Sequence, residues 1–209
     1  LQVLKGIDLQ VSASETLAVT GPSGCGKSTL LHILGTLDTP SGGSMQLDGI
    51  DPFTLDDQSL AHFRNQNIGF IFQDHHLLPQ LSVLENVLIP AIANGRPDQD
   101  CLQRARQLIE RVGLADRIEH RPAELSGGER ERVAVARSLI HQPTLLLADE
   151  PTGNLDQTNA RQVGSLLLEM HEQEAMMLVV VTHSLELAGR FPMHRELQNG
   201  LLAEVGAPS

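Results

Sequence analysis

Four continuous apolar runs, each ending at glycines or polar residues, stand out in the hydrophobic pattern of this chain. They cover residues 17–20, 68–72, 145–148 and 178–182. Runs of this length without alternation are typical of strands that are buried on both faces of a parallel sheet. Ligands bind at the carboxyl edge of such sheets, which is where the polar residues follow. The pattern therefore predicts an α/β fold with a mostly parallel sheet and a functional edge.

Helical patterns occupy the segments between these runs. The expected helices cover residues 28–34, 56–66, 82–94, 99–112 and 157–174, and another begins near Ser126. Because residues 77–142 contain no strand-like run, they are interpreted as a helical subdomain inserted into the sheet. We therefore expect one domain over residues 1–209, with a core of residues 1–76 and 143–209 and a helical subdomain of about residues 77–142.

Shorter strands are predicted outside the parallel sheet. Residues 7–11 alternate between apolar and polar, which is typical of a half-buried strand, and we expect this N-terminal β part to be antiparallel. Residues 45–47 are expected to form a short strand before an Asp-Gly turn at residues 48–49. Residues 195–205 predict a hairpin around an Asn-Gly turn.

A glycine-rich segment after the first apolar run matches the phosphate-loop pattern G-x-x-x-x-G-K-[ST] at every fixed position. Glycines let consecutive backbone N–H groups surround a β-phosphate, Lys27 reaches the β- and γ-phosphate oxygens, and the Ser28 hydroxyl binds Mg²⁺. The alternative is a chance glycine turn. The residues expected to bind a nucleoside triphosphate are Gly21, Pro22, Ser23, Gly24, Cys25, Gly26, Lys27, Ser28 and Thr29.

Two acids, Asp149 and Glu150, directly follow the third apolar run. A phosphate-loop enzyme holds Mg²⁺ with an acid at this place, so Asp149 is expected to bind the metal directly or through water. Glu150 points differently, and it is the candidate carboxylate that orients or deprotonates the attacking water. The alternative is that both acids merely end the strand and cap the next segment.

A second helix start carries Leu-Ser-Gly-Gly-Glu at residues 125–129. Ser126 and Glu129 match a capping box, which by itself indicates only that a helix begins. Gly127 and Gly128 would leave backbone N–H groups free to face an anion. One nucleotide hardly needs two such helix starts from one chain. A symmetric head-to-tail pair, in which Ser126 and Gly128 of one copy close over the γ-phosphate held by the other, would use both.

The chain resembles the nucleotide-binding subunits of ABC transporters across nearly its whole length. The resemblance rests on the order and spacing of these segments together with Gln73, residues 153–156 and His183. The resemblance implies that the ligands are ATP and Mg²⁺, and that Gln73 senses Mg²⁺ and the attacking water while linking to a transmembrane partner. It also implies that His183 contacts the γ-phosphate and that Asp156 belongs to a loop crossing a dimer interface. By itself, His183 would be an ordinary histidine at a strand end. The implied catalytic residues are Glu150, His183 and Gln73, and the implied metal ligands are Ser28, Gln73 and Asp149.

Residues 149–156 look like the branch of this family that includes macrolide exporters, the cell-division ATPase and the lipoprotein-releasing ATPase. Within that branch, residues 75–79, 84–87 and 120–124 look most like the lipoprotein-releasing subunit. The resemblance implies an ATPase that forms a homodimer around two ATP and drives transmembrane permease subunits from the cytoplasmic face of a bacterial inner membrane. A macrolide-type exporter or a cell-division complex is the alternative.

Other classes of protein share some of these sequence motifs. A DNA-repair or chromosome-organising ABC ATPase would interrupt it with long coiled coils or zinc-binding cysteines, and neither occurs in this sequence. A phosphate-loop kinase or GTPase would leave residues 125–129 and His183 unexplained, and the sequence has no Asn-Lys-x-Asp guanine motif. The adjacent His75 and His76 could indicate a metal site, but no third ligand at useful spacing supports that reading.

Three features depart from the family pattern. These ATPases usually stack adenine on an aromatic ring near the start, whereas no aromatic residue precedes Phe53. We therefore expect the ring to lie upstream of Leu1, in a sequence trimmed at its N-terminus. Glu131 stands where the family usually has Gln, and Ser184 stands where Asp is common. The departures at Glu131 and Ser184 put in question the fine coupling of ATP hydrolysis to transport rather than the ATPase activity itself.

The amino-acid composition restricts the classes of binding partner and the cellular compartment that fit this chain. The net charge is −11, with 15 Lys and Arg against 26 Asp and Glu, so we expect no nucleic acid partner. A disulfide between Cys25 and Cys101 would spoil the phosphate loop, which favours a reducing compartment. The longest apolar run, residues 175–181, is too short to cross a bilayer, so we expect a peripheral protein without a membrane span of its own.

Overall fold

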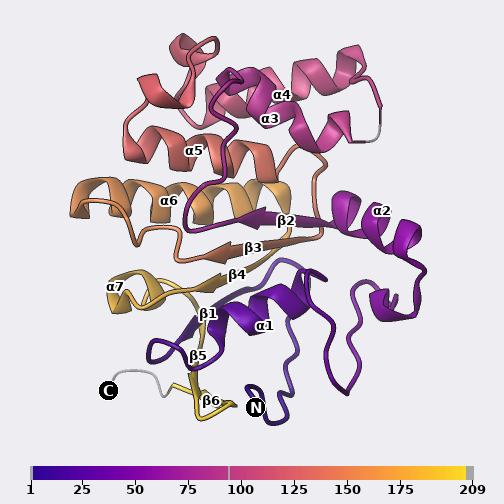
Figure 1. The fold of residues 1–209 in the computed structure, drawn as a ribbon. Coiled ribbons are helices and arrows are strands. Elements are labelled where there is room, and N and C mark those ends of the chain that lie inside the picture. The colour runs from indigo at the N-terminus through magenta and orange to yellow at the C-terminus, as the bar shows by residue number, and fades with distance from the viewer. Residues whose placement is uncertain (1, 94, 206–209) are drawn as a thin grey trace.

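The computed structural model describes residues 2–93 and 95–205, which form an α/β fold (Figure 1). The strands are β1 (Thr16–Thr20), β2 (Ile68–Ile71), β3 (Leu145–Asp149), β4 (Met177–Val181), β5 (Met193–Gln198) and β6 (Leu201–Glu204). The α-helices are α1 (Lys27–Leu34), α2 (Asp57–Asn67), α3 (Val83–Ile92), α4 (Gln99–Arg111), α5 (Gly127–Ser138), α6 (Gln157–Glu174) and α7 (Leu185–Ala188). Short 3-10 helices cover Pro52–Thr54, Ala115–Arg117 and Pro122–Glu124.

The six strands form one sheet in the order β2-β3-β4-β1-β5-β6. Neighbouring strands from β2 to β5 are parallel, and only the β5–β6 hairpin among these pairs is antiparallel. Asp149 at the end of β3 is in register with Val181 at the end of β4, and Val19 of β1 pairs with Val181 as well. The carboxyl ends of β1, β3 and β4 therefore meet at one edge, which confirms the predicted mostly parallel sheet.

The central strands are buried on both faces, as their unbroken apolar sequences predicted. Along β3, Leu145 and Leu147 pack on the side of α1 and α2, whereas Leu146 and Ala148 pack on the side of α3 to α6. This alternation follows from the two-residue period of a strand, which sends successive side chains to opposite faces. The sheet consequently lies between two hydrophobic cores that hold its edge residues in place.

Helices α3, α4 and α5 lie together at the top of Figure 1, between β2 and β3 in chain order. Their proposed separation as a helical subdomain of about residues 77–142 stays a prediction. No helix within residues 2–93 and 95–205 has the length and apolar character needed to cross a membrane. Cys25 and Cys101 are both free thiols.

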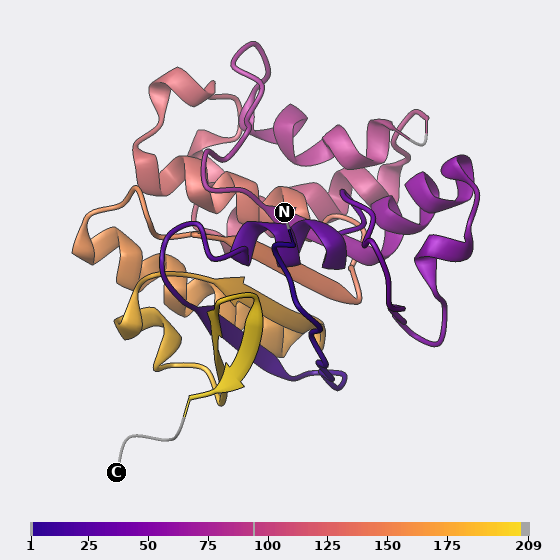
Figure 2. The same ribbon diagram turned by 60° about the horizontal axis from the view of Figure 1, so that its bottom comes forward.

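Two predicted strands do not form. Residues 7–11 alternate in exposure as expected, but the segment runs without strand structure in front of α1 (Figure 2). The Lys5 N–H donates to the Gly200 carbonyl at 2.7 Å, and Ile7 and its apolar neighbours rest on the core of the α1 face. Residues 45–47 contribute only an isolated bridge between Leu47 and Ile50. Alternation reports which side chains touch the core, whereas a strand also needs a partner backbone.

Candidate functional site

The phosphate loop lies between β1 and α1, and its first glycine is required by geometry. Gly21 has φ 146°, and a Cβ atom there would lie 2.2 Å from the Leu197 carbonyl oxygen. A side chain at Gly24 would meet nothing within 4 Å, although its φ of 76° still favours glycine. The loop is thus held against the β5–β6 hairpin at Gly21 and is open at Gly24.

The N-terminus of α1 differs from those of the other long helices because Gly26 provides no side-chain cap. The first N–H groups of a helix have no partner within the helix, so a capping side chain usually binds them. At α1 these donors are left for a ligand, which is the arrangement that fits a phosphate. The caps of α2 to α6 are Asp56, Ser82, Asp98, Ser126 and Asp156.

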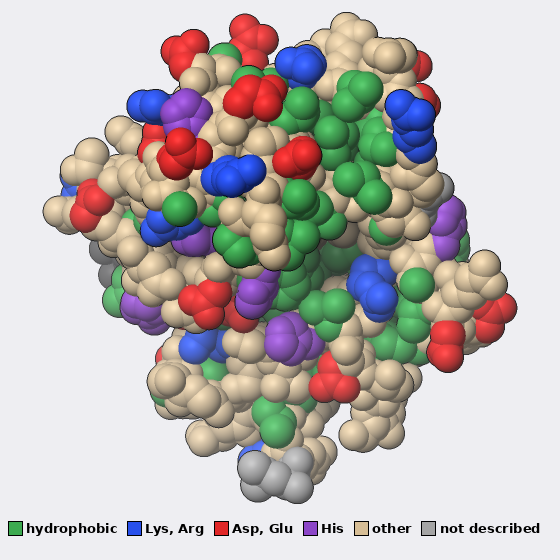
Figure 3. All heavy atoms as spheres, turned by 45° about the horizontal axis from the view of Figure 1, so that its top comes forward, with side chains coloured by type: hydrophobic (Ala, Val, Ile, Leu, Met, Phe, Trp, Pro, Cys, Tyr) green, Lys and Arg blue, Asp and Glu red, His purple; other side chains and the backbone are tan. Residues whose placement is uncertain are grey.

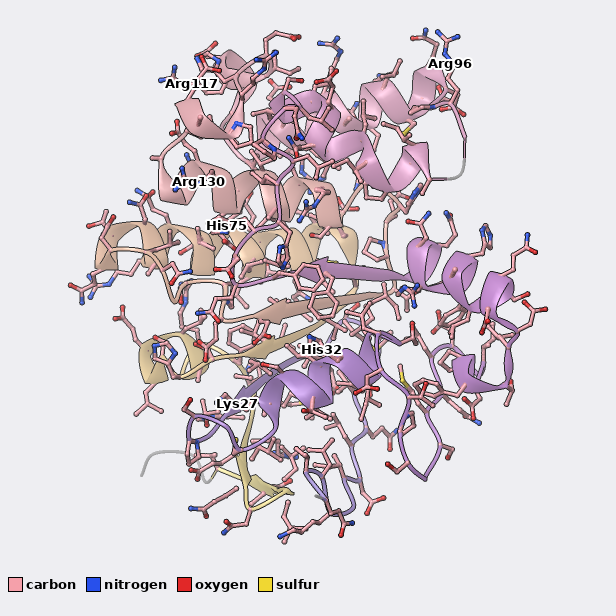
Figure 4. The ribbon with its side chains drawn as sticks, viewed as in Figure 1. Lys27, His32, His75, Arg96, Arg117 and Arg130 are labelled. Carbon is pink, nitrogen blue, oxygen red and sulfur yellow. The ribbon has the colours of Figure 1, made fainter. Side chains whose placement is uncertain are left out.

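Lys27 follows Gly26 and its ammonium group folds over the loop. Its Nζ atom donates to the carbonyl oxygens of Gly21 at 2.9 Å and Pro22 at 3.0 Å. Figure 4 shows Lys27 at the start of α1, with His32 further along the same helix. Phosphate oxygens are stronger acceptors for an ammonium group than neutral carbonyls, so this side chain suits a bound triphosphate.

Asp149, the last residue of β3, lies near the start of α1. Its carboxylate lies near the Ser28 hydroxyl and the Lys27 ammonium group, both of which act on its pKa. Burial raises the pKa of Asp149, and the Ser28 hydroxyl offsets only part of that rise. Carboxylate and hydroxyl oxygens are the ligands that Mg²⁺ prefers, so the pair fits a magnesium ion next to the phosphates.

Glu150 follows Asp149 and contacts His183. Its backbone adopts a left-handed conformation with φ 47°, and its Oε2 atom accepts a hydrogen bond from the His183 N–H at 3.1 Å. The same oxygen lies 2.9 Å from the Nδ1 atom of the His183 ring. The Glu150 side chain is 12% exposed, whereas that of His183 is 68% exposed. A largely buried carboxylate is therefore held by two nitrogen atoms of one accessible residue.

Gln73 is exposed directly after β2, and the structure connects it to the turn before α6. The Gln73 carbonyl accepts a hydrogen bond from Asn154 Nδ2 at 3.3 Å. Asn154 belongs to residues 153–156, in which the family resemblance implied a role for Asp156 but none for Asn154. No sequence signal identifies this contact, because it joins two loops that are far apart in the chain.

The second helix start forms the predicted capping box. The Ser126 Oγ atom accepts a hydrogen bond from the Glu129 N–H at 3.3 Å, and the Glu129 carboxylate accepts one from the Ser126 N–H at 2.8 Å. Gly127 is partly exposed, whereas Gly128 is buried, and a Cβ atom on Gly128 would lie 2.5 Å from Asn159 Oδ1. Gly128 is therefore needed for the close packing of α5 on α6.

Asp156 caps α6 by accepting hydrogen bonds from the N–H groups of Thr158 and Asn159 at 3.0 Å each. Hydrogen bonding with Asn159 lowers the pKa of Asp156, so the carboxylate is ionised at neutral pH. Figure 4 shows Arg130, near the start of α5, well apart from Lys27 at the start of α1. The two helix starts of one chain therefore do not meet.

The adjacent histidines lie beside α5, where His75 contacts Glu131. In the part of the chain that the structure describes, no group of three or more His, Cys, Asp or Glu side chains is placed to hold a metal ion. The Nδ1 atom of His75 instead lies 2.5 Å from a carboxylate oxygen of Glu131.

A phosphate loop before an uncapped helix, with Asp149, Glu150 and His183 at the same sheet edge, defines a phosphate-loop nucleotide-binding protein. The family model described as ABC transporter matches residues 4–153, and the chain belongs to that family. The expected resemblance is thus confirmed, and the chain is an ATP-binding cassette subunit.

Named relatives cover nearly all of the chain. It is 57% identical over 206 residues to the lipoprotein-releasing system ATP-binding protein LolD 1 of Rhodopirellula baltica, a match that covers 99% of this chain and 90% of the relative. It is 50% identical over 200 residues to LolD of Syntrophus aciditrophicus, with 96% and 90% covered. The dimeric structure of the bacterial ABC transporter cassette MJ0796 has a TM-score of 0.88 and 36% identity, with 99% of this chain and 91% of that chain covered. The same cassette is also known as a dimer in a post-hydrolysis state bound to ADP and Pi.

Proposed function

We propose that this chain is the ATP-hydrolysing subunit of an ABC complex that releases lipoproteins from a bacterial inner membrane. The observation that carries the hydrolytic part is the Glu150 carboxylate held by His183 next to the Asp149–Ser28 pair. The cargo is inferred from relatives at 50% identity or more, which are lipoprotein-releasing system ATP-binding proteins.

Each residue at the sheet edge has a distinct role in the proposed reaction. The phosphate loop and Lys27 bind the phosphates of ATP, and Ser28, Asp149 and Gln73 hold Mg²⁺, which neutralises charge on the phosphate oxygens when bound. Glu150 orients the attacking water and accepts its proton. His183 holds Glu150 in place and, because its ring is exposed, can also reach the γ-phosphate.

The remaining predicted site residues act on the nucleotide of a second copy. Ser126, Gly127 and Gly128 form the start of α5. Arg130, near this helix start, lies well apart from Lys27 in Figure 4, so a homodimer around two ATP is needed to use both helix starts. Asp156 lies in the turn that the Gln73 segment contacts, which connects the proposed dimer interface to the site of hydrolysis. The dimeric arrangement of the related cassette supports this proposal.

The surface after β2 and along α3 is the proposed contact with the permease subunits. Leu78 is 46% exposed, and Ile92 at the end of α3 is 51% exposed. Figure 3 brings the α3 and α4 end of the molecule toward the viewer and shows hydrophobic side chains gathered on that face. An apolar area of this kind marks a contact with another protein. Binding there would hold the chain at the cytoplasmic face of the membrane.

The test is affinity purification of tagged Glu150→Gln protein from its own cells in mild detergent, with Lys27→Ala as the control that does not bind ATP. Mass spectrometry is expected to identify a permease with few membrane spans and a large periplasmic domain, together with lipoproteins. Recovery of division proteins or of an efflux channel would contradict the cargo. Recovery of DNA-bound proteins would contradict the transporter function.

A further inference from the structure

Glu131 is a carboxylate on the buried face of α5. Its side chain is 1% exposed, and its Oε2 atom lies 2.5 Å from Nδ1 of His75. Burial raises the pKa of Glu131, and the contact with His75 offsets part of that rise. The Oε1 atom of Glu131 and the Nδ1 atom of His75 are both buried and lack a partner at hydrogen-bond geometry among the residues described. The contact between His75 and Glu131 is therefore a close approach of two polar groups rather than a regular hydrogen bond. Because a buried carboxylate is costly unless it is paired, His75 is the contact that makes Glu131 tolerable at this place.

Arg137, further along α5, holds the same segment by its backbone. Its Nη1 atom donates to the His76 carbonyl at 2.7 Å, and its Nη2 atom donates to the His75 carbonyl at 2.5 Å. His75 and His76 have φ values of 59° and 47°, a left-handed conformation that residues other than glycine rarely adopt. The turn therefore depends on α5, since the contacts from Glu131 and Arg137 hold it in this unfavourable conformation.

The turn carries Gln73 at its other end. Gln73 lies two residues before His75, and its carbonyl is bound by Asn154. The helix that provides Glu131 begins with Ser126 and Gly128. One set of side-chain contacts thus connects the loop that carries Gln73 with the helix start proposed to act on the second nucleotide. Figure 4 shows His75 on the segment that runs beside α5.

We propose that Glu131 is a positioning residue for ATP hydrolysis, which acts through His75 to hold Gln73 at the sheet edge. This proposal rests on the proposed role of Gln73 in hydrolysis. Glu131 does not touch the nucleotide, because its side chain is enclosed between α5 and the turn. A residue that only stabilised the fold would lower the unfolding temperature and leave catalysis by the folded protein unchanged.

The first experiment measures kcat and KM for ATP with the full-length protein. Glu131→Ala and His75→Ala are each expected to lower kcat by roughly tenfold to a hundredfold, since a small misplacement of a positioned group costs that much. KM should stay within about twofold, because the phosphate loop is unchanged. The double variant should be no slower than either single one, because both changes remove the same contact.

Two further variants separate positioning from stability. Glu131→Gln keeps a side chain of the same length that can hydrogen-bond to His75. Its kcat is therefore expected to stay much closer to that of the unmodified protein than the kcat of Glu131→Ala. Glu110→Ala makes the same change as Glu131→Ala on the exposed face of α4, and its kcat should match that of the unmodified protein. Should Glu131→Ala fail to fold, His75→Ala removes the same contact from the loop side. An unchanged kcat for folded His75→Ala would overturn the proposal.

A Gln73→Ala background distinguishes the failure of this inference from the failure of the proposed function. If Glu131 acts through Gln73, adding Glu131→Ala to Gln73→Ala causes no further loss of kcat. If Gln73→Ala slows hydrolysis while Glu131→Ala and His75→Ala do not, the positioning proposal alone is wrong. If Gln73→Ala itself leaves kcat unchanged, the role of Gln73 is wrong, and the positioning proposal is overturned with it.

Discussion

In the proposed reaction, binding and hydrolysis of ATP depend on different side chains of this site. Lys27 lies over the phosphate loop, where it contacts the carbonyls of Gly21 and Pro22. Glu150 directly follows β3, which β4 separates from β1 in the sheet, and His183 contacts its carboxylate. Because Lys27 and Glu150 make separate contacts, we expect substitutions at these two residues to affect binding and hydrolysis differently.

Lys27→Ala should abolish tight ATP binding, whereas Glu150→Gln should retain it and lose hydrolysis. We expect Lys27→Ala to weaken binding at least about tenfold, because it removes an ammonium group that pairs with phosphate oxygens. Glu150→Gln should lower kcat by about a hundredfold or more, since an amide cannot accept the proton of the attacking water. Binding of a fluorescent ATP analogue and release of phosphate are the measurements. A Glu150→Gln protein with more than half of the original rate would rule out Glu150 as the base.

Among the elements, β2 and α5 pack unusually closely at Gly69. A Cβ atom on this glycine would lie 2.4 Å from the backbone carbonyl oxygen of Ser138 at the end of α5. Gly69→Ala is therefore expected to lower the free energy of unfolding by about 1–3 kcal/mol. Gly42→Ala is the matched control, because a Cβ atom there meets nothing within 4 Å. Urea unfolding measures both variants, and equal stability would contradict the packing described.

Helices α4 and α6 are joined by Glu174 at the end of α6. Its carboxylate accepts hydrogen bonds from Arg104 Nη2 at 2.6 Å and Arg111 Nη1 at 2.5 Å. Burial by itself would raise the pKa of Glu174, but the hydrogen bonds from Arg104 and Arg111 outweigh it and the net pKa is lowered from 4.5. The stabilisation is therefore fully present above the unfolded-state pKa and is lost as the pH falls through the lower pKa of the folded protein.

Glu174→Gln should cost about 1–3 kcal/mol of unfolding free energy at pH 7, because it leaves two guanidinium groups without their anion. The difference from the unmodified protein should shrink as the pH falls below 4.5, the ordinary value for this group. Urea unfolding across this pH range is the measurement. Glu172→Gln, on the exposed face of the same helix, should leave both the stability and its pH dependence unchanged. A pH-independent difference for Glu174→Gln would refute the assignment.

In the proposed homodimer each molecule contributes half of each of two sites, because the starts of α1 and α5 are far apart within one chain. Glu150→Gln protein with saturating Mg²⁺–ATP should therefore sediment as a dimer, since ATP stays bound between the two copies. Lys27→Ala should remain monomeric under the same conditions. Sedimentation velocity separates the two states. A monomeric Glu150→Gln protein at saturating Mg²⁺–ATP would contradict the use of Ser126 and Gly128 on a second nucleotide.

The sequence by itself determined those features that depend on neighbours in the chain. The phosphate loop, the Ser126–Glu129 capping box and the acids after β3 are local patterns, and an apolar run shows directly that a strand is buried on both faces. Such features require only the backbone geometry of a few consecutive residues. The mostly parallel sheet followed from them, and so did the prediction of the nucleotide site.

Only the tertiary structure decided which distant groups meet. The contact of Glu150 with His183, the fit of Gly128 against Asn159 and the pairing of Glu131 with His75 join elements that the chain separates by many residues. The absence of a strand at residues 7–11 was decided in the same way, because the alternation of side chains does not specify a partner backbone. Local patterns fix which side chains face the core, whereas the packing of helices on the sheet fixes which of them touch.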